Sequence, residues 1–102
     1  MDVLAHGPAT WFLLGDGDRR YFDVRVSRSA AEWSQLIELD DVERAAYAAR
    51  GTAFLDELAA RIDGEPEAYA ARDLRATLGK QVTATIVAWR AGAARAPHDD
   101  AR

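Results

Sequence analysis

The 102-residue sequence contains no cysteine and no asparagine, and it contains only two histidines. Without cysteine the chain can form no disulfide, no thiolate zinc site and no cysteine nucleophile. Without asparagine it offers no acceptor for N-linked glycosylation. The two histidines, His6 and His98, stand near opposite ends of the chain, so neither has a partner at the spacing of a metal-binding helix. We therefore assign no metal-ligating residue.

Long apolar runs are also missing, and no stretch approaches the roughly 18 residues that a transmembrane helix requires. The opening residues, MDVLAHGP, lack the basic and apolar regions of a signal peptide. We expect a cytoplasmic protein with no membrane partner. Of the thirteen cations only Lys80 is a lysine, and alanine is abundant. This skew indicates a GC-rich genome, such as that of many bacteria, rather than a functional property.

Motifs for catalysis and cofactor binding are absent from the sequence. Gly15 and Gly17 precede a strand-like run instead of a helix, which is not the pattern of a phosphate loop or a dinucleotide fingerprint. No serine stands in a Gly-x-Ser-x-Gly setting. The acidic pair Asp40-Asp41 would diverge on a helix. We assign no catalytic and no cofactor-binding residue, expect no cofactor, and favour a protein that is not an enzyme.

The length fits one domain, because about 100 residues can bury one core but not two. We place a single globular domain at residues 1–96. Residues 97–102, Pro-His-Asp-Asp-Ala-Arg, contain almost nothing that could be buried, and we expect them to form a disordered tail.

Residues 10–27 predict a β-hairpin. Phe22, Val24 and Val26 alternate with polar or amphipathic residues, which is the period of a strand with one buried face. The turn falls at 15–18, whose glycines and aspartates tolerate positive φ values. Residues 31–39 fit either a strand or a helix, and we favour a third strand because an isolated hairpin is only marginally stable.

After Asp40 the composition changes to good helix formers, with Asp40 or Asp41 as the expected N-cap. We predict helices at about 41–63, 66–76 and 80–92, although the β-branched residues in 80–90 would also suit a strand. The predicted fold class is therefore α+β. An N-terminal antiparallel β-meander of two or three strands (about 10–39) is followed by two or three helices packed on one sheet face.

The segment 41–63 carries apolar residues on two nearly opposite stripes of a helix. One stripe is rich in alanine and the other is made of large side chains, so one helix could not bury both against a single sheet. Either Gly51 divides the segment into two helices, or a continuous helix presents the alanine stripe to another helix or a second subunit. The residues that we assign to the exposed stripe, as a possible interface, are Val42, Ala46, Ala49 and Ala53.

Charge is unevenly distributed along the chain, although the net charge is only −4. Residues 32–67 contain ten carboxylates against three arginines, whereas residues 68–95 contain five cations against Asp73. An acidic segment packed beside a basic one would explain this pattern, and so would a face that meets a charged partner. A nucleic-acid partner is disfavoured by the acidic sequence pI of about 5.1.

The outer face of the hairpin is the second possible interface. If Phe22, Val24 and Val26 are buried, the opposite face is lined by Tyr21 and Arg25, with Trp11 or Trp33 beside them. Aromatic residues and arginine are enriched at protein interfaces. The alternative is that another helix covers this face.

From these observations we expect a non-enzymatic protein–protein interaction module of the regulator, immunity or inhibitor type. Its partner would be another protein or a second copy in a homodimer. The alternative is a small enzyme or ligand-binding domain, with a site built from dispersed Asp, Glu and Arg side chains.

Overall fold

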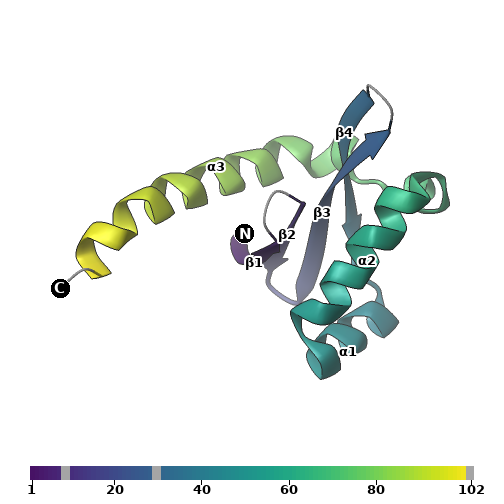
Figure 1. Ribbon diagram of the computed structural model, residues 1–102, viewed down its shortest axis with the longest axis horizontal. Coiled ribbons are helices and arrows are strands. Elements are labelled where there is room, and N and C mark those ends of the chain that lie inside the picture. Colours follow the sequence, from purple (N-terminus) through teal and green to yellow (C-terminus); the bar gives the residue numbers. More distant parts are fainter. Residues whose placement is uncertain (8–9, 29–30, 101–102) are drawn as a thin grey trace.

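The computed structural model describes residues 1–7, 10–28 and 31–100, and it describes side chains for 1–7, 10–27 and 31–92. Four strands come first: β1 (Asp2–Gly7), β2 (Trp11–Asp16), β3 (Arg19–Arg28) and β4 (Ala31–Glu38). They are followed by α1 (Asp41–Arg50), α2 (Thr52–Gly64), the 3-10 helix η1 (Pro66–Arg72) and α3 (Arg75–Asp100). The predicted α+β class is confirmed (Figure 1).

The strands form one antiparallel meander in the order β1-β2-β3-β4. The hairpin predicted at 10–27 is confirmed as β2 and β3, with Asp16 paired to Arg19 across a two-residue turn. Gly17 in this turn has a φ of 61°, a conformation that glycine adopts without steric cost. The third strand predicted at 31–39 is confirmed as β4.

The sequence prediction missed β1, which pairs with β2. A register shift between Val3 and Ala5 interrupts the pairing. As a result Val3 packs on one face of the sheet and Ala5 on the other, although the two residues are two positions apart. This bulge removes the period-two alternation by which a strand is predicted from sequence.

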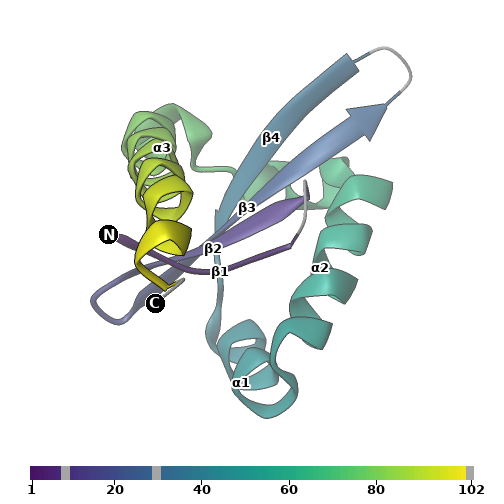
Figure 2. The ribbon, with the colours of Figure 1, turned by 60° about the vertical axis from the view of Figure 1, so that its left-hand side comes forward.

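Helices cover both faces of the sheet, so the prediction that they pack on one face is wrong (Figure 2). The strands contain neighbouring large residues, such as Leu13-Leu14 and Leu36-Ile37, that are all fully buried. Because successive side chains of a strand point to opposite faces, each pair supplies one residue to each layer. The sheet therefore requires a cover on both sides.

One face of the sheet packs against α2 and the other against α3. The buried residues of the α2 layer include Phe54, Leu55, Leu58, Ala59 and Ile62. The α3 layer is smaller, and Val82 and Ile86 of α3 pack there against Leu14, Tyr21 and Leu36.

Gly51 separates α1 from α2, which decides between the two arrangements left open for residues 41–63. Its φ of 67° and ψ of −148° are accessible to glycine but strained for other residues. Asp40 caps α1 in a capping box, in which its carboxylate accepts from the backbone N–H of Glu43 and Glu43 accepts from that of Asp40. Because the chain turns at Gly51, α1 need not bury the same stripe as α2.

The two C-terminal helices differ from their predicted boundaries. The expected helix at 66–76 is the shorter η1, and the helix expected at 80–92 is confirmed but begins at Arg75. The Asp73 carboxylate lies at this junction and accepts from the backbone N–H groups of Leu36 and Arg75. The side chains of residues 97–102, which we predicted to form a disordered tail, lie outside the described residues. The disordered tail therefore stays a prediction.

Candidate functional site

Two of the residues predicted at an interface lie in the core. Trp11 is 2% exposed and Tyr21 is 5% exposed. Trp11 pairs with Val24, and its ring centroid lies 5.5 Å from that of Phe22, so its expected place on the opposite face is wrong. Its indole N–H donates to Asp56 of α2 at 2.9 Å. Tyr21 does lie on the face opposite Phe22, but α3 covers it, as the alternative interpretation predicted.

Trp33 and Arg25 lie near the outer end of the β3–β4 hairpin but on different faces. Trp33 pairs with Val26 and shares its face, which corrects the alternative placement of Trp33 beside Tyr21. The residue is 41% exposed. Arg25 is exposed on the α3 side, where its guanidinium forms a 3.1 Å ion pair with Glu32.

The predicted alanine stripe is largely uncovered. Val42 is 78% exposed, and Ala49 and Ala53 are exposed as well. Ala46 is half-buried and packs against the α2 layer of the core. These residues lie at the end of the sheet near α1, away from the outer end of the β3–β4 hairpin (Figure 2). The predicted interface residues therefore form no single surface.

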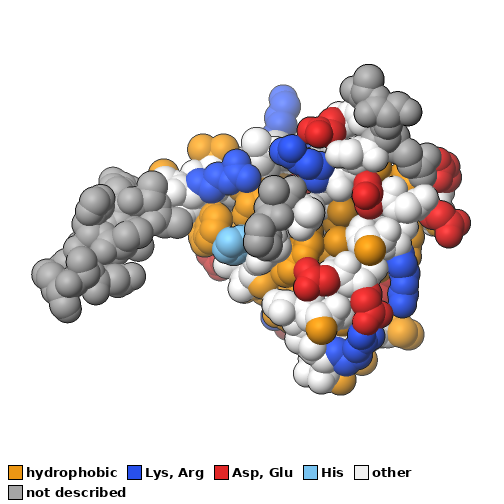
Figure 3. Space-filling model, viewed as in Figure 1, with side chains coloured by type: hydrophobic (Ala, Val, Ile, Leu, Met, Phe, Trp, Pro, Cys, Tyr) orange, Lys and Arg blue, Asp and Glu red, His pale blue; other side chains and the backbone are white. Residues whose placement is uncertain are grey.

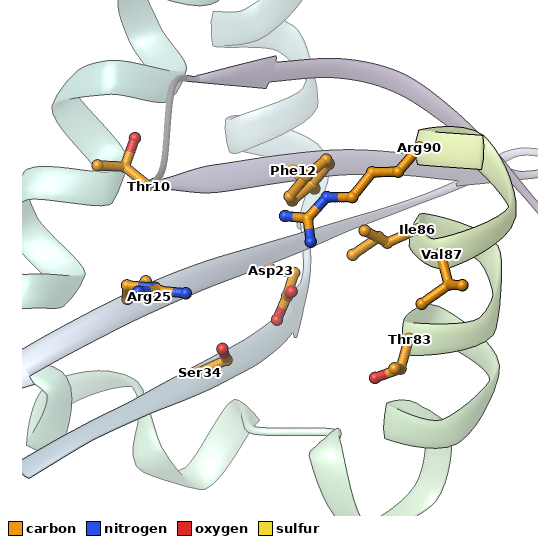
Figure 4. Close-up of a pocket in the computed structure, with 9 residues that line it drawn as sticks. All are labelled: Thr10, Phe12, Asp23, Arg25, Ser34, Thr83, Ile86, Val87 and Arg90. Carbon is orange, nitrogen blue, oxygen red and sulfur yellow. The ribbon is translucent and has the colours of Figure 1, made fainter. Parts of the chain in front are cut away.

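A cleft of about 180 Å³ opens between α3 and the strands that it covers (Figure 4). We call it the sheet–α3 cleft. Its strand side presents Phe12, Asp23 and Arg25, and its helix side presents Ile86 and Arg90. The remaining lining residues are Thr10, Ser34, Thr83 and Val87.

The floor of the sheet–α3 cleft is fixed by an ion pair that joins the sheet to α3. The carboxylate of Asp23 lies 3.0 Å from the guanidinium of Arg75, which also donates from Nε to the carbonyl of Ser34 at 2.7 Å. Burial raises the pKa of Asp23, and the attraction of Arg75 opposes this shift. Asp23 therefore already has a charged partner.

The rim of the cleft contains a stacked cation. The guanidinium carbon of Arg90 lies 5.3 Å from the ring centroid of Phe12, and Figure 4 shows the two groups facing each other. Phe12 in turn contacts Trp89 at 5.8 Å and His6 at 6.0 Å between ring centroids. Within the described part of the chain, no carboxylate forms a salt bridge with Arg90.

The acidic and basic segments of the sequence lie on opposite faces of the sheet. From Arg75 to Gly92, α3 carries three cations and no carboxylate. On the other face, residues 40–65 carry seven carboxylates against three arginines. In Figure 3, cations lie along the described part of α3 and carboxylates gather over the region of α2. The sheet therefore separates an acidic layer from a basic one.

The sequence prediction found only one residue of this cleft, Arg25, as an interface candidate. Asp23 is one of the polar residues that alternate with Phe22, Val24 and Val26, but no sequence pattern connects Phe12 with Arg90. They are 78 positions apart in the sequence, and their contact depends on the docking of α3. No local pattern could have paired them.

The chemistry available in the cleft is recognition by charge, stacking and hydrogen bonding. The described residues include no group of three or more His, Cys, Asp or Glu side chains that could hold a metal ion. None of the described helices is long and apolar enough to cross a membrane.

Comparison with known proteins found no relative. No family model, no curated protein and no solved structure matches this chain. Its function must therefore be argued from the geometry of its own surfaces.

Proposed function

We propose that this chain is a non-enzymatic protein–protein interaction module that receives an acidic side chain of its partner in the sheet–α3 cleft. The observation that carries the proposal is the Arg90 guanidinium, which is held over the Phe12 ring with no salt bridge to a carboxylate of the described residues. Stacking orients its planar donors, so a carboxylate that enters the cleft can be bound in a bidentate manner.

The size of the cleft favours a side chain over a cofactor or a metabolite. Its volume of about 180 Å³ is below the roughly 300–1,000 Å³ of typical small-molecule sites. An Asp or Glu side chain fits that space while the rest of the partner lies on the surrounding surface. For the sheet–α3 cleft, this favours a side chain of a protein partner over a bound cofactor or metabolite.

Arg25 can add a second cation to the same site. Its ion pair with Glu32 is more than half exposed on both sides, and exposed pairs contribute only about 0–1 kcal/mol. Arg25 could therefore release Glu32 and bind a carboxylate of the partner at little cost in free energy. Thr83 and Ser34 supply polar groups at the wall of the cleft.

The arrangement of the arginines supports a protein partner rather than a nucleic acid. Arg72 forms a bidentate ion pair with Glu43, at 2.6 and 2.9 Å, and Arg75 is paired with Asp23. Two of the cations in the basic segment are thus already engaged. A phosphate backbone is usually bound by a row of available cations.

The exposed face of α1 is where we expect a second copy in the homodimer form of this proposal. Val42 is a large apolar residue of α1 that is 78% exposed. An apolar contact there would leave the sheet–α3 cleft of each copy open to its partner.

The test is affinity capture from the native host with matched charge variants. We compare the tagged wild type with Arg90→Gln and with Arg61→Gln, which removes the same charge from the exposed surface of α2. A protein captured by wild type and Arg61→Gln but lost from Arg90→Gln supports the proposal. Equal capture by all three chains contradicts the assignment of the cleft.

A further inference from the structure

A second cleft lies on the other side of the sheet, where η1 packs against β4. We call it the η1 cleft. It has a volume of about 210 Å³. Its lining residues are Trp33, Gln35, Pro66, Glu67, Ala70 and Asp73. It shares no lining residue with the sheet–α3 cleft.

Gln35 gives this cleft an unusual feature, a buried hydrogen-bond acceptor with no donor among the described residues. The residue is 3% exposed, and its Nε2 donates to the carbonyl of Pro66 at 2.9 Å. Only the N–H side of the amide can face a carbonyl, so this bond fixes the orientation of Oε1. No described residue donates to that oxygen. A buried acceptor without a partner is destabilising, and a donor that reached it would be bound favourably.

Trp33 supplies an aromatic surface at the mouth of the same cleft. Trp33 is 41% exposed, whereas Val26, its cross-strand neighbour on the same face, is fully buried. Among the aromatic side chains, the indole of tryptophan attracts a cation to its electron-rich face most strongly. A flat cation could therefore stack on Trp33 without a large rearrangement of the core.

Asp73 supplies the negative charge. Its Oδ1 accepts from the backbone N–H groups of Leu36 at 3.1 Å and Arg75 at 3.0 Å, which holds the carboxylate at the junction of η1 and α3. The charge is half-buried and therefore less screened than one on the open surface.

We propose that the η1 cleft binds the guanidinium group of an arginine side chain from a partner protein. A guanidinium is planar and carries five N–H donors, so it can stack on Trp33, donate to Gln35 Oε1 and pair with Asp73 at the same time. An ammonium is a compact point charge and cannot stack in this way. This site is independent of the sheet–α3 cleft and has the opposite charge preference.

The test is an NMR titration of the full chain with N-acetyl-arginine amide, which mimics an arginine within a protein. The signals to follow are the indole N–H of Trp33, assigned with the Trp33→Phe variant, and the side-chain amide of Gln35. We expect both to shift to saturation. N-acetyl-citrulline amide has nearly the same shape without the charge, and it should bind about 10-fold more weakly because the cation–π attraction and the ion pair both require the positive charge.

Two variants assign the binding to these residues. Gln35→Met removes the acceptor at nearly constant volume, and Gln81→Met makes the same change at an exposed position of α3. We expect Gln35→Met to weaken binding and Gln81→Met to leave it unchanged. If Gln35→Met does not fold, Trp33→Leu serves instead, with an expected loss of about 10-fold.

Three results would overturn the proposal. The first is an equal affinity for the arginine and citrulline compounds, which would show that charge plays no part. The second is wild-type affinity in a folded Gln35→Met or Trp33→Leu protein. The third is a long-lived water on the Gln35 amide in the arginine-saturated protein, detected by water–amide cross-relaxation, because the acceptor would then already be satisfied.

Discussion

Asp23 of β3 and Arg75 at the start of α3 form an ion pair of 3.0 Å across 52 positions of sequence. This pair joins the sheet to the helix that covers its second face. Burial of Asp23 outweighs the attraction of Arg75, so the pKa of Asp23 is raised above its ordinary value of 3.8. A carboxyl with a raised pKa binds more protons in the folded state, so its contribution to stability falls as the pH rises through that pKa.

We expect Asp23→Asn to remove this pH dependence. The free energy of unfolding of the wild type minus that of the variant should decrease as the pH rises above about 4, and it should level off once Asp23 is ionised in the folded protein. Denaturant unfolding of both proteins at several pH values measures this difference. Asp2→Asn, an exposed change of the same kind, is the control. A difference that increases with pH would show that the attraction of Arg75 dominates.

The stacked arginine at the cleft rim predicts selective binding of a carboxylate. N-acetyl-glutamate amide should perturb the NMR signals of Arg90 and Thr83, and N-acetyl-glutamine amide should do so about 10-fold more weakly because the hydrogen bonds lose their charge. Arg90→Gln should reduce the difference between the two compounds to what Arg25 alone supports, whereas Arg61→Gln should preserve the full difference. Binding should also weaken at high salt, because ions screen charges near the surface. Equal binding of the two compounds by the wild type would rule out recognition of charge in this cleft.

The positive φ of Gly51 predicts a large cost for any side chain at this position. Gly51→Ala should lower the free energy of unfolding by about 1–3 kcal/mol, since the strain arises from the backbone and an added Cβ meets no atom within 4 Å. Gly64→Ala, at the end of α2 where an added Cβ is also uncrowded, should change stability far less. Chemical denaturation gives both values. If the Gly51→Ala variant is as stable as the wild type, the backbone between α1 and α2 has a different conformation from the one described here.

Local patterns in the sequence predicted the elements but not the layers. The alternation of Phe22, Val24 and Val26 was sufficient for β3, and Asp40 with Glu43 was sufficient for the start of α1. The same alternation suggested that only one face of the sheet is buried. Nothing in the local sequence around Tyr21 and Leu14 indicates that a helix covers them. Their burial depends on α3, which returns to the sheet about 60 positions later.

The candidate sites depend even more on long-range contacts. Trp33 was selected from its residue type alone, and it does line a cleft. Gln35, two positions away, was assigned no role, since its significance comes from the Pro66 carbonyl that engages its amide N–H. Trp11 was selected by the same rule as Trp33 and is buried. Residue type identified candidates, whereas only the docked helices determine which of them meet solvent.

The exposed Val42 on α1 predicts self-association. If a second copy covers this face, the wild type should show a mass that increases with concentration in light scattering, and Val42→Glu should be monomeric because a buried charge without a partner is costly. Ala48→Glu adds the same charge at another exposed position of α1, outside the stripe, and should associate like the wild type. A wild type that stays monomeric at high concentration would contradict the homodimer. Because Arg90 lies on the opposite layer, that result would leave the carboxylate-binding prediction for the sheet–α3 cleft intact.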